Sequence, residues 1–185
     1  MNKLFEKLTN QMAEGIDSSV ALSLHNKNQE VEIIHFLWAM LTNTNSVLNQ
    51  LLNKMNIDKA AIELEAKSYA SKLTTVSSVT KESIKLSRNF VNSLEKAEGI
   101  AAKNGDKFIA IDSWLISNFD SKELKAVLGK YINLHDAKKE LEAMRSGATI
   151  DSASSDENLE ALGKYGIDLN QKAINGELDP VIGRD

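Results

Sequence analysis

Residues 63–66 read Glu-Leu-Glu-Ala, and the same four residues return at 140–143. Other matches occur at a similar offset of 76 to 78 positions: Asn26 with Asn104, Leu37 with Leu115, Leu51-Leu52 with Val127-Leu128, and Lys54 with Lys130. Because these matches keep the same order and nearly the same register, they indicate an internal duplication. A duplication of this length decides the fold, since each copy is one structural unit.

Apolar residues around the first copy recur every three or four positions, which is the period of an α-helix. One long helix is predicted over about residues 4–25, followed by a helix around Val31–Leu41 that is apolar on several faces and therefore buried. Ser46 and Asp58 carry side chains that favour helix N-caps, so a third and a fourth helix are expected after them. The first repeat is predicted to occupy residues 1–73.

The polar, β-branched stretch 74–80 interrupts this pattern, which then restarts with a long helix ending near Asn104-Gly105. Asp112 and Ser121 are predicted to cap two short helices, and a fourth helix completes the copy. The second repeat is predicted at residues 80–145. The expected fold class is all-α, with two pseudo-symmetric four-helix repeats packed as a pair.

After the second repeat the residues become small and polar. Residues 146–156 have too few apolar side chains to offset the entropy of ordering, so they are predicted to form a flexible linker. Residues 157–185 contain short helical patterns whose apolar faces have no partners of their own. They are predicted to be the truncated start of a further domain.

Composition excludes several classes of function. The net charge is −4, and no Lys/Arg cluster is dense enough to follow a phosphate backbone, so no nucleic acid is expected as a partner. No apolar run approaches the ~18 residues that span a bilayer, so no membrane is expected either. There is no cysteine, which removes disulfides and thiolate chemistry. A cytoplasmic location is predicted, because the N-terminus lacks the pattern of a signal peptide.

The usual parts of an active site are also missing. The sequence has neither a G-x-x-x-x-G-K-[ST] loop nor a G-x-G-x-x-G loop for phosphates. His25, His35 and His135 are far apart, and His35 falls in the predicted buried helix, where a hydrogen-bonded core histidine is expected. The chain is therefore predicted to be no enzyme and to hold no metal or cofactor.

Residues 164–185, which end in Leu-Asp-Pro-Val-Ile-Gly-Arg-Asp, are the most specific stretch. They closely resemble the start of the first ATPase domain in the Clp/heat-shock family of AAA+ unfoldases. The duplicated helical unit resembles the N-terminal domain of the same family. Within that family the chain is most similar to the protein disaggregases.

The resemblance implies a longer protein that is an ATPase, uses ATP and Mg, forms a hexamer and contains a coiled coil. Such a protein threads unfolded or aggregated proteins through its pore, and the DnaK system is an expected co-chaperone. The N-terminal domain would catch these clients and deliver them to the pore. In the longer protein, Val181, Ile182, Gly183 and Arg184 would lie near the nucleotide.

A module that recognises unfolded chains needs an exposed apolar groove with a few polar groups at its rim. Four apolar candidates flank the loop after the long helix of the second repeat, although for any one of them a place in the core is the favoured alternative: Leu94, Ala97, Ile100 and Phe108. The resemblance adds three polar candidates at positions that the family uses in substrate handling: Thr9, Asp106 and Asp112. For Asp112 and Asp106, a helix cap and a turn are the alternative roles.

Two other functions remain open from the sequence. The chain could be the adaptor-docking N-terminal domain of a protease-coupled Clp ATPase, which binds a folded partner instead of an unfolded one. It could also be a free-standing helical enzyme or scaffold unrelated to ATPases.

Overall fold

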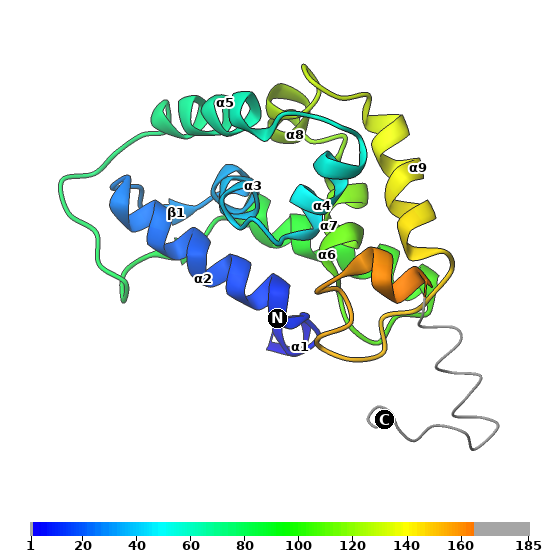
Figure 1. Cartoon of the computed structure of the whole chain (residues 1–185). Helices are drawn as coiled ribbons and strands as arrows, with labels where there is room; N and C mark the ends of the chain where they lie inside the picture. The colour runs from blue at the N-terminus through cyan, green and yellow to red at the C-terminus, as the bar shows by residue number, and fades with distance from the viewer. Residues whose placement is uncertain (1, 165–185) are drawn as a thin grey trace.

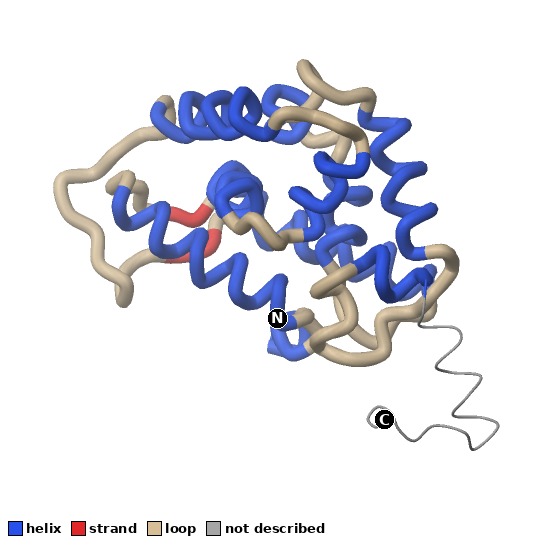
Figure 2. Tube along the Cα trace, viewed as in Figure 1, coloured by secondary structure: helices blue, strands red, loops and turns tan. Residues whose placement is uncertain are grey.

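The structure is a computed structural model that describes residues 2–164, and this part of the chain is helical apart from two very short strands (Figures 1 and 2). The first half contains α1 (Asn2–Glu6), α2 (Asn10–His25), β1 (Glu30–Val31), α3 (Ile33–Thr42), α4 (Val47–Lys54) and α5 (Lys59–Ser71). The second half contains β2 (Lys85–Leu86), α6 (Arg88–Asn104), α7 (Ile111–Asn118), α8 (Lys122–Val127) and α9 (Leu134–Arg145). Residues 159–164 are again helical. The all-α prediction is confirmed.

Helix α3 lies at the centre of the molecule, as its apolar pattern predicted (Figure 1). Its Phe36 ring contacts two aromatic rings from the second half of the chain. The ring centroids are 5.5 Å apart for Phe90 of α6 and 4.6 Å apart for Trp114 of α7. All three side chains are fully buried. Helix α2 approaches α3 closely at Gly15, where an added Cβ would lie 2.5 Å from the Met40 Cε atom. Aromatic contacts of this kind join the two halves into one core.

The duplication is visible in how the two halves pair. Strand β1 runs parallel to β2, with Val31 opposite Leu86, and an isolated parallel bridge joins Leu8 to Ile109. Leu8 and Leu86 are 78 positions apart, and so are Val31 and Ile109. The two bridges are therefore exchanged by one pseudo-twofold operation that maps α2–α5 onto α6–α9. The predicted fold of two pseudo-symmetric four-helix repeats is confirmed.

Most predicted helix boundaries are confirmed by cap contacts. The hydroxyl of Ser46 accepts a hydrogen bond from the Asn49 amide, and that of Ser121 accepts one from the Leu124 amide. The Asp58 carboxylate accepts from the Ala60 amide, which starts α5. Helix α6 ends at Gly105, whose φ of 75° is the left-handed conformation that glycine adopts readily. Local side-chain chemistry was therefore sufficient to place these ends.

The predicted single helix over residues 4–25 is wrong near its start, because the chain is extended at Thr9 and α2 begins only after it. The Thr9 hydroxyl accepts from the Met12 amide, while its own amide donates to the Ile109 carbonyl at 3.1 Å. The Ile109 amide in turn donates to the Lys7 carbonyl at 2.7 Å. Pairing with the second repeat thus replaces the helical hydrogen bonds that the spacing predicted.

Residues 146–156 are not the flexible linker that their composition predicted, and residues 146–158 are called the return segment below. After α9, the segment turns back and runs along the body toward α1 (Figure 1). Ile150 is fully buried, and its carbonyl accepts from the Lys107 amide at 2.8 Å. The Asn10 amide donates to the Ala153 carbonyl, also at 2.8 Å. Main-chain hydrogen bonds to the body hold a segment that has few apolar side chains of its own.

The helical stretch 159–164 packs on the same body. Leu159 is fully buried, and Glu160 forms an ion pair with Lys54 of α4. The remaining residues of the predicted ATPase start, 165–185, lie outside the described residues, and the predicted domain boundaries stay predictions.

Two glycine-to-alanine substitutions are expected to act in opposite directions. Gly99 lies exposed in α6 with open space where a Cβ would be, so Gly99→Ala should raise the free energy of unfolding by about 1 kcal/mol. An added Cβ at Gly163 would overlap the Met144 carbonyl oxygen, so Gly163→Ala should detach residues 159–164 from α9. Urea unfolding checks the first change, and faster hydrogen exchange at the Leu159 amide checks the second. Unchanged exchange at Leu159 would contradict this close packing.

Candidate functional site

The most polar feature of the interior is a cluster around Arg145 at the end of α9. Its Nε and Nη2 atoms donate to the two carboxylate oxygens of Asp112, both at 2.9 Å. Its Nη1 atom donates to both oxygens of Asp106 at 2.7 Å. The three side chains are only 7%, 3% and 0% exposed, respectively. Buried charges require such pairing, so this cluster fixes the end of α9 against α7 and the loop after α6.

The structure therefore corrects two assignments. Asp112 was predicted to cap α7, but the N-cap position is Ala110, and Asp112 lies in the first turn with its carboxylate on Arg145. Asp106 is committed to the same guanidinium and also accepts from the Ile150 amide at 2.9 Å. Both carboxylates are thus occupied within the protein in this conformation.

The remaining predicted residues divide into buried and partly exposed ones. Leu94 and Ala97 are fully buried on the inner side of α6, so their assignment as client contacts is corrected to core residues. Thr9 is also fully buried, where it caps α2 and donates its hydroxyl hydrogen to Asp156 Oδ2 at 2.9 Å. Ile100 and Phe108 are half-buried and remain available at the surface.

Asp156 was missed by the sequence reasoning. It is fully buried, and its Oδ2 atom accepts from the Ile111 amide at the start of α7 as well as from Thr9. The pKa of its carboxyl is raised to about 6, chiefly by burial and also by the nearby Asp112 carboxylate, although both hydrogen bonds act to lower it. The Oδ1 atom has no hydrogen-bond partner among the described residues. Nothing local in the sequence marks this residue, because its partners come from elsewhere in the chain.

Arg145 was also missed, although the sequence contains a signal for it. Under the pseudo-symmetry, Asp106 is equivalent to Asn28 of the first repeat, and Asp112 is equivalent to Ile34. Two acids that replace uncharged residues at equivalent inner positions require a cation nearby.

Next to this cluster, the surface has a hollow between α7 and α9 that we call the α7–α9 groove. It joins two neighbouring cavities of about 420 and 370 Å³, which share Ile116 and Lys138. Ile116, Ile100 and Leu134 are half-buried along it, so apolar atoms are accessible there. The charged residues around it are mostly basic: Lys103, Lys125, Lys138, Asp120, Glu142 and the edge of the Arg145–Asp112 pair.

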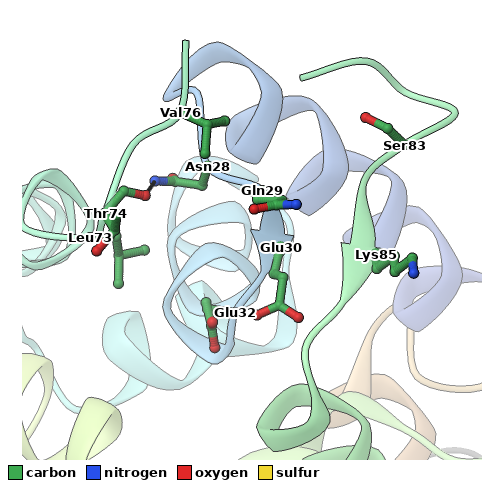
Figure 3. A pocket seen from close by; sticks show the side chains of 9 residues that line it. All are labelled: Asn28, Gln29, Glu30, Glu32, Leu73, Thr74, Val76, Ser83 and Lys85. Atoms are coloured by element: carbon green, nitrogen blue, oxygen red, sulfur yellow. Dashed lines mark hydrogen bonds between the residues drawn. The ribbon is translucent and has the colours of Figure 1, made fainter. Parts of the chain in front are cut away.

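Another hollow lies under the loop that joins the two repeats and has a volume of about 540 Å³ (Figure 3). Glu30, Glu32 and Lys85 line it together with uncharged polar residues. Below it, His35 Nε2 donates to Asn28 Oδ1 and its Nδ1 atom accepts from the Glu32 amide. His35 is fully buried, so its burial and these two hydrogen bonds confirm the prediction of a hydrogen-bonded core histidine. The burial lowers its pKa to about 4.

Two negative findings apply to the described residues. None of their helices is both long and apolar enough to cross a membrane. Their His, Asp and Glu side chains form no group of three or more that could hold a metal ion.

Comparison with known proteins assigns the fold to a family. Residues 7–131 match the model of the Clp repeat (R) N-terminal domain. The chain belongs to the Clp repeat N-terminal domain family. This match covers the first repeat from residue 7 and the second repeat as far as α8, and it agrees with the duplication seen in the strand register.

The Clp repeat family includes curated relatives that match over nearly the whole chain. The chain is 53% identical over 181 residues to the chaperone protein ClpB of Wolinella succinogenes, and 50% identical over 182 residues to that of Helicobacter hepaticus. Each match covers 98% of this chain but only 21% of the relative, so the chain spans about a fifth of the length of these relatives.

Solved structures share the fold at low sequence identity. The N-terminal domain of Hsp104 from Candida albicans superposes with a TM-score of 0.70 at 19% identity, covering 81% of this chain and 99% of that one. A ClpV N-domain in complex with a VipB peptide gives a TM-score of 0.60 at 18% identity, covering 76% and 88%.

Removal of the central cation should be costly. Arg145→Met would leave two buried carboxylates unpaired, so the free energy of unfolding is expected to fall by about 3–5 kcal/mol. The control Arg88→Met removes an exposed arginine at the start of α6 and should change it by no more than about 0.5 kcal/mol. Urea unfolding of both variants makes the comparison. Equal effects would show that the buried cluster contributes nothing particular to stability.

Asp156 should make stability depend on pH. Its folded pKa of about 6 lies above the ordinary 3.8, so its protonated form favours folding. That contribution is complete below pH 3.8 and is lost as the pH rises through 6. Between pH 8 and pH 5 the wild type should therefore gain on the order of 1 kcal/mol relative to Asp156→Asn. Comparing the two at each pH cancels the opposite effect of His35. A constant difference between them would contradict this assignment.

Proposed function

We propose that the chain is the client-binding N-terminal module of an ATP-dependent Clp-type chaperone. It binds exposed apolar segments of unfolded or aggregated proteins and delivers them to the pore of a hexamer formed by ATPase domains. ATP and Mg belong to those domains, and the module itself performs no bond chemistry. Support comes from the family match and from the relatives that are named as ClpB chaperones.

The observation that carries this proposal is the α7–α9 groove. Exposed apolar side chains distinguish unfolded chains from folded ones, so a client-binding surface must offer accessible apolar atoms. Ile100 of α6 and Ile116 of α7 do so in a hollow that the Arg145–Asp112 pair also lines. Long lysine side chains around the hollow can cover varied apolar segments with their methylene groups, which suits a site that has many clients.

Adaptor docking is the second candidate. The ClpV N-domain that shares this fold is bound to a peptide from one named partner, VipB. A site for a single adaptor should discriminate strongly between that partner and unrelated unfolded chains, whereas a client site should bind many of the latter with similar affinity. The DnaK system as a co-chaperone and a cytoplasmic location stay predictions.

Substitution of the groove isoleucines tests client binding. The double variant Ile100→Ser/Ile116→Ser should lower the affinity for labelled, reduced carboxymethylated α-lactalbumin by about tenfold, because two partly accessible apolar contacts are lost. Leu64→Ser is the matched control, since Leu64 on α5 is 69% exposed and lies far from the groove in sequence and outside its lining. Fluorescence anisotropy measures both affinities. If Leu64→Ser weakened binding as much as the double variant, the client would be binding nonspecifically to exposed apolar residues and not in the α7–α9 groove.

A further inference from the structure

The return segment lies on the body in the way that an extended peptide lies in a receptor. The amides of Lys107 and Asn10 donate to the carbonyls of Ile150 and Ala153. The Ile150 amide donates to the Asp106 carboxylate. The Gln11 side chain donates to the Asp156 carbonyl at 3.3 Å. All four contacts use the main chain of the segment, so they are available to any extended sequence.

Three side chains of the segment are buried along this path: Ala148, Ile150 and Asp156. Ile150 is fully buried, and the Asp156 carboxylate is buried against Thr9 and the Ile111 amide. Between them, Asp151, Ser152 and Ser154 are exposed. The groove therefore selects an aliphatic residue and an acid six positions later, and it tolerates varied residues between them.

The pseudo-symmetry explains why this groove receives a carboxylate. In the first repeat the residue before α3 is Glu32, whose pKa is raised by burial and partly lowered by a hydrogen bond with Ser87. The equivalent residue before α7 is Ala110, whose methyl side chain cannot accept a hydrogen bond. Thr9 is the equivalent of Ser87, and it finds its carboxylate on Asp156 instead. The acid at this place comes from a separate segment, so it can be exchanged.

The chain's own segment is held incompletely. The Asp156 Oδ1 atom is buried without a hydrogen-bond partner among residues 2–164, which penalises the docked state. Of the apolar side chains in the segment only Ala148 and Ile150 are buried, so little apolar area is lost when it leaves. A foreign peptide with the same pattern and larger apolar side chains would compete with it.

We propose that the groove between the N-terminal ends of α2 and α7 is a second peptide-binding site. The return segment occupies it in cis. In trans it binds an extended segment of another protein that has an aliphatic residue followed six positions later by an acid. This site shares no apolar residue with the proposed client groove, although the lining of that groove reaches Asp112 in the first turn of α7 and Gly147 at the start of the return segment.

The test uses a fluorescent peptide that copies residues 148–158, Ala-Thr-Ile-Asp-Ser-Ala-Ser-Ser-Asp-Glu-Asn, and the same peptide with Ala in place of Asp156. Each is titrated against the whole chain and against the double variant Ile150→Ser/Asp156→Ala, which loosens the segment. The expected result is that the first peptide binds the double variant at least about tenfold more tightly than the wild type, because the cis competitor is weakened. The peptide without the acid should bind several-fold more weakly than the first. The control variant of the chain, Asp151→Ala, removes an exposed acid from the same segment. It should bind the first peptide with the same affinity as the wild type.

Hydrogen exchange of the Lys107 and Asn10 amides reports release of the segment directly. Both should exchange faster in the double variant than in the wild type. Unchanged exchange would overturn the proposal, because Ile150 and Asp156 would then not hold the segment. Fast exchange without peptide binding, or equal affinity for the two peptides, would overturn it too. Adding Ile116→Ser to the double variant should leave peptide binding unchanged. A loss there would assign the peptide to the α7–α9 groove and remove the second site.

Discussion

The rest of the second repeat depends on the ion pairs that the guanidinium of Arg145 forms with Asp112 and Asp106. It is planar and presents its N–H donors in a fixed fork, so it can bind two carboxylates only where they converge on it. Asp112 and Asp106 meet this requirement from the first turn of α7 and from the loop after α6. Because all three groups are buried, any change in their geometry would expose an unpaired charge to a medium that solvates it poorly. The cluster thus fixes the direction in which the chain leaves α9.

That direction determines the path of everything after residue 145. Ser146 and Gly147 both have left-handed backbone conformations, with φ of 52° and 79°, which turn the chain back on itself. Asp106 then receives the Ile150 amide on an oxygen that it also offers to Arg145. One carboxylate therefore links the helix end to the return segment. The same acids that the family resemblance marked for substrate handling act here as supports for the surface around them.

Much of the fold could be predicted from the sequence, because the decisive signals were local. The caps at Ser46 and Asp58, the end at Gly105 and the all-round apolar pattern of α3 each depend on neighbouring residues only. The errors arose where distant partners decide. Leu8 keeps the helical spacing and yet pairs with Ile109 of the other repeat. The return segment looked disordered because composition counts its own side chains, whereas its main chain is held by amides of the body.

The candidate site was predictable only in part for the same reason. The family resemblance singled out Asp106 and Asp112, and the structure does bring them together. Their charge implies a nearby cation, but nothing in the sequence identifies that cation as Arg145 in particular. Ile100 was found because it flanks the right loop, while Ile116 was missed because it lies among the core residues of a short helix. A periodic pattern shows which face is apolar, but the depth at which each residue lies depends on the neighbouring helices.

Departures from the pseudo-twofold symmetry are where the two repeats differ in chemistry. The contact of Phe36 with Trp114 joins equivalent positions, 78 residues apart, so it lies where the symmetry operation maps the core onto itself and it contributes only stability. In contrast, the replacement of Glu32 by Ala110 leaves the start of α7 dependent on a carboxylate from outside the repeat. The return segment supplies this carboxylate, and it buries little apolar area of its own. When it is released, the eleven residues from 146 to 156 within it could extend to about 36 Å. Occupation of the groove by another chain would therefore lengthen the connection between the helical body and the residues that follow. Capture at the start of α7 and release of the tether are thus coupled, because the same few hydrogen bonds hold either the return segment or the other chain.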